Sequence, residues 1–121
     1  MEEYRVIIAG SRHFRNYNLL AQKCDKILSV KAASHQIVIV SGTAAGADRL
    51  GERYAHERSY KIVRFPADWD NDGLSAGPIR NAKMAEYADA LVTFWDGQSR
   101  GTRNMIETAR SRGLQIRVVY I

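Results

Sequence analysis

The amino-acid sequence predicts one α/β domain of Rossmann-like type, with three layers in which helices flank a mainly parallel sheet of about five strands. Short β-branched apolar runs alternate with segments whose apolar residues recur at helical spacing. The first four runs each end in small or turn-forming residues. Strands that alternate with helices pair in parallel through right-handed crossovers. We expect residues 1–121 to form this single domain.

The composition of the apolar runs separates buried strands from edge strands. The predicted strands are residues 5–9, 36–40, 61–65, 90–95 and 116–120. The first, second and fourth are almost continuously apolar, which is typical of strands buried on both faces. The third and fifth carry Arg64 and Arg117, so we expect them to be edge or half-exposed strands.

Helices are predicted in the gaps between these strands. Between the first two strands, Leu20, Cys24 and Leu28 share one helical face. The other predicted helices have apolar stripes within residues 47–55, 81–88 and 102–109, and Pro78 suits the first turn of the third helix. Residues 66–70 follow the third strand, and after them a polar loop leads to residue 76.

Composition limits the classes of partner. The net charge of +5 favours anionic partners, but the basic residues form no dense run, so nucleic-acid binding is compatible with the sequence and not indicated by it. No apolar run approaches the roughly 20 residues of a membrane span, and we expect no membrane partner.

The start of the chain is not signal-like and the single cysteine cannot form an internal disulfide, so we expect a cytoplasmic location. His13, His35 and His56 lack metal-site spacing, and we expect no metal or cofactor.

Ligands of parallel sheets bind outside the carboxyl ends of the strands, where the strand order reverses. The segment after the second strand, residues 41–48, is built of small residues and leads directly into a helix. Unpaired N–H groups at a helix start form an anion site. This segment is neither a Walker A sequence nor Gly-x-Gly-x-x-Gly. We expect Asp48 to brace it or cap the helix, and contact with a ribose hydroxyl or a base is the alternative.

The segment after the fourth strand, residues 96–102, is a second glycine-bearing loop that opens a helix, with Thr102 as a candidate N-cap. Trp69 could stack on a base, although packing is the commoner role of such a residue. Arg80 sits at a predicted helix start, where the dipole disfavours a cation unless an anion is bound. The predicted ligand-binding residues are Gly10, Ser11, Arg12, Ser41, Gly42, Thr43, Gly46, Ala47, Asp48, Trp69, Arg80, Asn81, Asp96, Gly97, Ser99, Arg100, Gly101 and Thr102.

The resemblance to a known family rests on five segments in order, residues 10–14, 41–48, 66–69, 76–84 and 96–102. Together they resemble the YspA / cpYpsA-related family of the SLOG superfamily, named for the Smf/DprA DNA-processing and LOG proteins. The resemblance implies a Rossmann-like domain with a nucleotide-type ligand over two glycine-bearing loops, and LOG proteins suggest a homo-oligomer, a dimer or larger. LOG proteins are phosphoribohydrolases that carry Arg-x-x-x-Met and Pro-Gly-Gly-x-Gly-Thr-x-x-Glu. Arg80 and Met84 match the first motif, but Met105 stands where the second has its glutamate.

Three functions remain open at this point. The first is binding of a nucleotide or nucleotide-derived ligand, for sensing or processing. The second is a LOG-like nucleotide N-glycosidase or phosphohydrolase, with Arg80, Asp48 and Asp68 as candidate catalytic residues and Asp96 as a further carboxylate. The third is a DprA-like domain that handles single-stranded DNA, for which no regular array of aromatic residues is present.

Overall fold

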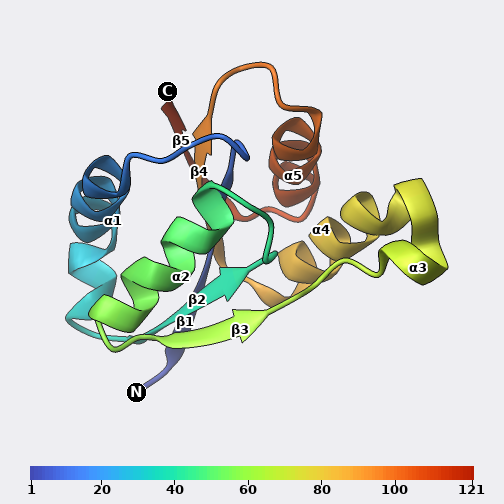
Figure 1. Ribbon diagram of the computed structural model, residues 1–121. Coiled ribbons are helices and arrows are strands. Elements are labelled where there is room, and N and C mark those ends of the chain that lie inside the picture. The colour runs from blue at the N-terminus through green and yellow to red at the C-terminus, as the bar shows by residue number, and fades with distance from the viewer.

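The computed structural model describes residues 1–121 and contains one sheet of five parallel strands in the order β3-β2-β1-β4-β5 (Figure 1). The strands are β1 (Glu3–Gly10), β2 (Gln36–Ser41), β3 (Lys61–Arg64), β4 (Ala90–Trp95) and β5 (Gln115–Tyr120). The three central strands are those with continuous apolar sequence, and β3 and β5 form the two edges. The predicted α/β Rossmann-like fold, with Arg64 and Arg117 exposed on edge strands, is therefore confirmed.

Helices cover both faces of the sheet and complete the three layers (Figure 1). The helices are α1 (Tyr17–Ala32), α2 (Ala47–Glu57), α3 (Trp69–Asp72), α4 (Ala76–Tyr87) and α5 (Arg100–Ser111). Alternate residues of a strand point to opposite faces, so Val6 and Ile8 pack with α1 and α2, whereas Ile7 and Ala9 pack with α4 and α5. No helix has both the length and the apolar character needed to cross a membrane.

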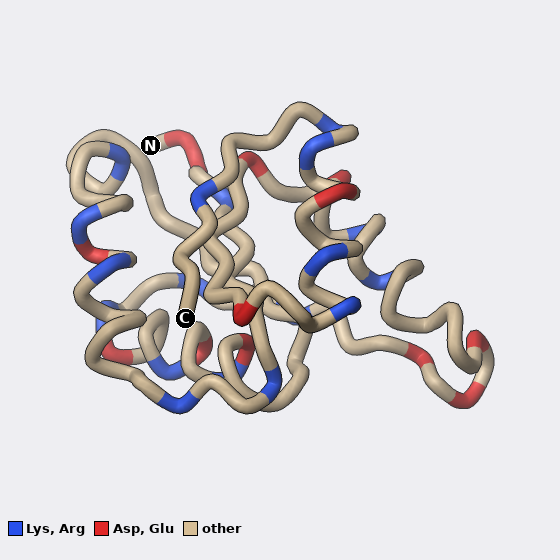
Figure 2. The backbone as a smooth tube through the Cα atoms, turned by 90° about the horizontal axis from the view of Figure 1, so that it is seen from above, with Lys and Arg blue, Asp and Glu red and all other residues tan.

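The segment after β3 is not the plain polar loop that the sequence predicts. It contains α3 and a single 3₁₀ turn, Gly73–Ser75, and it extends away from the sheet (Figure 1). The Asp68 carboxylate caps α3 by accepting a hydrogen bond from the Asn71 backbone N–H at 3.2 Å. Neither short helix buries a residue, and Figure 2, which colours the backbone by residue type, shows the acidic positions of this segment at one end of the molecule.

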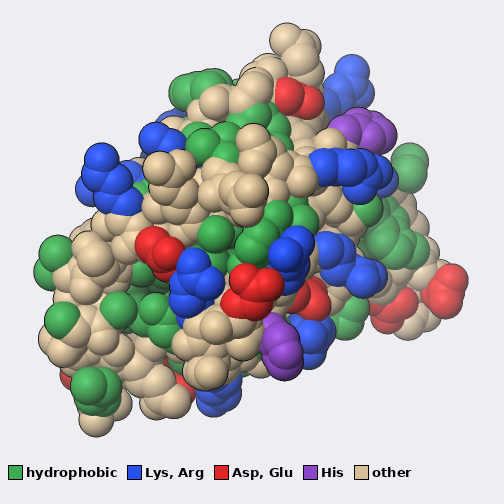
Figure 3. All heavy atoms as spheres, turned by 60° about the vertical axis from the view of Figure 1, so that its left-hand side comes forward, with side chains coloured by type: hydrophobic (Ala, Val, Ile, Leu, Met, Phe, Trp, Pro, Cys, Tyr) green, Lys and Arg blue, Asp and Glu red, His purple; other side chains and the backbone are tan.

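The charged side chains on the surface are mixed in sign. Figure 3 shows basic and acidic side chains interspersed on the face it presents, without a continuous basic stripe. The positive net charge is consequently not gathered into a groove on that face, as expected from the spread of arginine and lysine along the sequence.

Candidate functional site

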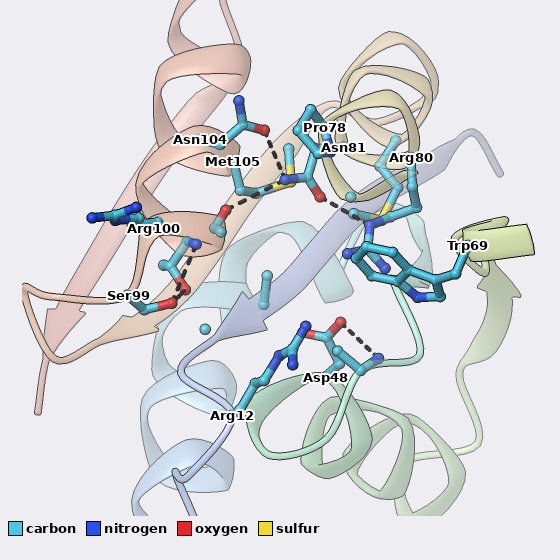
Figure 4. A pocket seen from close by; sticks show the side chains of 17 residues that line it. Arg12, Asp48, Trp69, Pro78, Arg80, Asn81, Ser99, Arg100, Asn104 and Met105 are labelled. Carbon is cyan, nitrogen blue, oxygen red and sulfur yellow. Dashed lines mark hydrogen bonds between the residues drawn. The ribbon is translucent and has the colours of Figure 1, made fainter. Parts of the chain in front are cut away.

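A cavity of about 440 Å³ opens between α4 and α5 at the carboxyl ends of the central strands (Figure 4). The chain runs from β1 outwards through β2 to β3 and then crosses to β4 and β5, so the strand order reverses between β1 and β4. Ala9 and Gly10 at the end of β1 form part of the cavity wall. The cavity thus lies at the switch point where ligands of open parallel sheets bind.

The structure brings many of the predicted ligand-binding residues to this cavity and leaves others outside it. Those that line it are Gly10, Arg12, Asp48, Trp69, Arg80, Asn81, Ser99, Arg100, Gly101 and Thr102. Those that do not are Ser11, Ser41, Gly42, Thr43, Gly46, Ala47, Asp96 and Gly97. In the second group, Ser11, Ser41, Ala47 and Asp96 form hydrogen bonds that hold the surrounding loops in place.

Ser11 joins the ends of the two central strands. Its backbone N–H donates to the Phe94 carbonyl at 2.9 Å, and its hydroxyl accepts from the Asp96 N–H at 3.2 Å. The next residue, Arg12, is exposed and extends towards Asp48 in Figure 4. The β1–α1 turn is therefore fixed at Ser11 and presents Arg12 to the cavity.

The start of α2 packs against this same turn. Gly46 has φ +78°, and a Cβ atom there would lie 2.4 Å from the carbonyl oxygens of both Ser11 and Arg12. The Ala47 N–H donates to the Ser11 carbonyl at 3.3 Å. The first helical N–H of α2 is thus hydrogen-bonded within the chain. Gly46 allows the β2–α2 loop and the β1–α1 turn to pack closely against each other.

The remainder of the β2–α2 loop is braced by side chains. Ser41 donates its hydroxyl hydrogen to Glu52 at 2.6 Å and accepts from the Thr43 N–H at 3.1 Å. Thr43 has φ +64°, a conformation that a β-branched residue adopts only under constraint. The Arg49 side chain donates to the Thr43 carbonyl at 3.0 Å and helps to hold the loop in this shape.

Asp48 is a buried carboxylate in the cavity wall, with 5% of its surface exposed. It braces the β2–α2 loop, as the sequence suggests, by accepting from the Ala44 N–H at 3.1 Å. Burial raises the pKa of Asp48 to about 6, although the Ala44 N–H and the nearby arginines, Arg80 and Arg12, act in the opposite direction. Burial therefore makes this cavity-facing carboxyl group easier to protonate than an exposed aspartate.

Arg80 crosses from α4 to the end of β2. Its guanidinium donates to the Gly42 carbonyl and, through Nε, to the Asn81 side chain at 3.0 Å. A Cβ atom at position 42 would lie 2.7 Å from Arg80 Nη1 and 2.8 Å from Asp48 Oδ2, so a larger residue there would displace the ends of these two side chains. Burial lowers the pKa of Arg80, the direction expected for a cation withdrawn from water.

The first turn of α5 forms the opposite wall. Ser99, and not Thr102, is its N-cap, and the two hydroxyl groups lie 3.1 Å apart. The backbone N–H groups of Arg100 and Gly101 have no hydrogen-bond acceptor within the chain. No atom lies within 4 Å of a Cβ placed on Gly101, so a ligand can approach the backbone at this helix start.

Comparison with known proteins gives the family of this chain. The family model described as "YspA, cpYpsA-related SLOG family" matches residues 4–71. Gene 61 protein of Mycobacterium phage D29 is 30% identical over 122 residues, a match that covers 93% of each chain. The chain belongs to the YspA, cpYpsA-related SLOG family.

Three solved structures have the same fold. DNA processing protein A (DprA) from Streptococcus pneumoniae matches with a TM-score of 0.71 and 17% identity, over 97% of this chain and 50% of that one. TM1055 matches with a TM-score of 0.66 and 18% identity, over 96% of this chain and 72% of that one. DprA from Helicobacter pylori matches with a TM-score of 0.66 and 19% identity, over 95% of this chain and 64% of that one. This SLOG chain thus spans half the length of the pneumococcal protein.

The cavity of this SLOG protein contains one of the three candidate carboxylates. Asp68 caps α3 and accepts from both nitrogens of Asn71, and Asp96 accepts from the Gln98 and Ser99 N–H groups at 2.8 Å each. These hydrogen bonds lower the pKa values of Asp68 and Asp96. Of the three, Asp48 alone lines the cavity.

The cavity also contains residues outside the predicted set. They are Ala9, Ala44, Gly77, Pro78, Met84, Asn104 and Met105. Asn81 donates to the Asn104 side chain at 2.9 Å and ties α4 to α5 behind the cavity. Gly101 and Asn104 are three residues apart on one helical face, a spacing that could have identified Asn104. Met105, at the position of the LOG glutamate, provides an apolar wall.

Proposed function

We propose that this SLOG protein binds a nucleotide, or a small molecule derived from one, in the cavity between α4 and α5. The observation that carries the proposal is the combination, in one cavity, of the open first turn of α5 with Arg12, Arg80 and Arg100. Free helix amides and guanidinium groups are the donors that phosphate prefers. The net charge of +5 attracts such an anion over a longer range.

The rest of the cavity suits the nucleoside. Trp69 is 51% exposed at its rim, where its ring can stack on a base. Met84 and Met105 provide apolar surface, and Asn81 and Asn104 provide polar groups at the back. A mixture of apolar wall and few polar groups is typical of small-molecule sites.

Arg12→Ala and Arg100→Ala are expected each to weaken nucleotide binding by about 1.5–3 kcal/mol, the usual strength of a hydrogen bond to a charged group. Both side chains are exposed and neither forms a hydrogen bond within the chain, so the melting temperature should not change. Isothermal titration with AMP, GMP and ADP measures the effect. Arg110→Ala, at the far end of α5, is the matched control.

Two outcomes would contradict this proposal. One is unchanged affinity in both arginine variants. The other is salt-sensitive binding of a single-stranded oligodeoxynucleotide by a protein that binds none of the mononucleotides. The Helicobacter pylori DprA structure is described by its single-stranded DNA binding mode, and the oligonucleotide therefore belongs in the same titration series.

A second candidate function is hydrolysis of the bound nucleotide to a free base and a ribose phosphate. Asp48 favours it, because a carboxyl group with a pKa of about 6 in the cavity wall can donate a proton to a departing base. If this reaction occurs, chromatography should detect free base released by the unaltered protein and none released by Asp48→Asn. Saturable binding by the unaltered protein without base release would exclude it.

A further inference from the structure

A second cavity, of about 230 Å³, lies on the other side of Arg80. It is formed by the end of β3, by α3 and by the flank of α4 that faces away from α5. Arg80 lines both cavities, so its side chain is the boundary between them. Trp69 of α3 lines the larger cavity, while its neighbour Asp68 lines the smaller one.

The Arg80 guanidinium still has hydrogen-bonding capacity at this boundary. Nη1 donates to the Gly42 carbonyl and Nε to Asn81, but Nη2 has no acceptor within the chain. Gly77 stands beside it, and a Cβ atom there would lie 4.0 Å from Nη2. An anionic group that passes from one cavity to the other would meet a fixed, partly buried cation.

The smaller cavity combines acceptors and cations. Asp68 and Asp72 supply carboxylate oxygens, and the carboxylate of Asp72 accepts no hydrogen bond within the chain, although its backbone N–H donates to the Asp68 carbonyl at 2.8 Å. Lys83 is exposed and also unpartnered, whereas Arg64 is paired with Glu52 at 3.0 Å. Carboxylates accept hydrogen bonds from hydroxyl groups, and an ammonium group attracts phosphate. This set suits a hydroxyl-rich group joined to a phosphate.

We propose that the ligand is a nucleoside diphosphate derivative that occupies both cavities. The diphosphate lies between the first turn of α5 and Arg80, the nucleoside lies beside Trp69 in the larger cavity, and a sugar-like second group lies between α3, α4 and the end of β3. This inference rests on the proposed nucleotide-binding function and names the ligand class of that site. A mononucleotide would occupy only the larger cavity.

Isothermal titration with AMP, ADP and ADP-glucose, and with GMP, GDP and GDP-mannose, tests the inference. In one of the two series, the nucleotide sugar is expected to bind at least about tenfold more tightly than the monophosphate, the equivalent of one additional charge-assisted contact. Lys83→Met and Asp72→Asn are each expected to remove most of this gain and to leave the monophosphate affinity unchanged. Lys23→Met on α1 and Asp70→Asn on α3 are matched controls at exposed positions outside both cavities.

The possible failures are distinguishable. Monophosphate binding with no gain for the nucleotide sugars would overturn the inference and leave the proposed function intact. A gain that survives in both Lys83→Met and Asp72→Asn would place the second group elsewhere and also overturn it. If none of the six nucleotides binds, the proposed function fails and the inference fails with it.

Discussion

Gly46→Ala is expected to lower the free energy of unfolding by about 3–5 kcal/mol, because two costs add. The residue has φ +78° and ψ −126°, and a side chain in such a conformation costs about 1–3 kcal/mol. The new Cβ atom would also lie 2.4 Å from two backbone carbonyl oxygens, and relieving this overlap costs a similar amount. For a chain of this size, we expect the melting temperature to fall by roughly 10–20 °C, as measured by circular dichroism.

Gly101→Ala is the matched control for this prediction. It lies in the first turn of α5, and no atom is within 4 Å of the added Cβ. Alanine in a helix is about 0.5–1 kcal/mol more favourable than glycine, so the fold should be unchanged or slightly stabilised. If Gly46→Ala melted at the same temperature as Gly101→Ala, the observed packing of the β1–α1 turn on α2 would be incorrect.

Asp48→Asn is expected to stabilise the protein relative to the unaltered chain at pH 7–8, and to do so much less at pH 4. The folded-state pKa of Asp48 is raised from 3.8 to about 6. The contribution of this group to stability is therefore fully present below pH 3.8 and is lost as the pH rises through about 6. A shift of this size corresponds to about 3 kcal/mol, and asparagine, which is never ionised, does not incur it.

Urea denaturation of both proteins between pH 4 and pH 8 measures this difference. The stability gap should widen between about pH 4 and pH 6 and then remain constant. Asp25→Asn provides the contrast, because its hydrogen bond with Arg58 lowers the pKa of Asp25 and makes the charged form the stabilising one. A gap that does not vary with pH for Asp48→Asn would show that this carboxyl group is ionised as readily in the folded as in the unfolded chain.

The sequence predicts most of the fold because the main elements follow from local patterning. Continuous apolar runs identify the three central strands, and Arg64 and Arg117 identify the two edges. The short helix α3 is not predictable in this way. It has four residues and buries none of them, so it has no apolar periodicity, and its only local signal is the cap at Asp68.

The candidate site is predictable only in part, since a run of small residues has more than one use. Gly46 and Gly101 both precede or open a helix in the sequence, but Gly46 packs against the β1–α1 turn while Gly101 faces the cavity. Asn104 and Met105 enter the site because α5 lies beside α4, a neighbour relation that depends on the order of the strands. That order is a tertiary property with no local signature.

The pairing of β1 with β4 joins segments that are far apart in the chain, with Val6 opposite Ala90. The cavity straddles this seam, and its walls come from residue 9 at one extreme and residue 105 at the other. A nascent polypeptide that ends before residue 99 has no α5 and therefore lacks one wall of the cavity. A ligand in this cavity, as proposed above, would therefore stabilise the domain only after α5 has formed, and it would not assist the earlier folding steps.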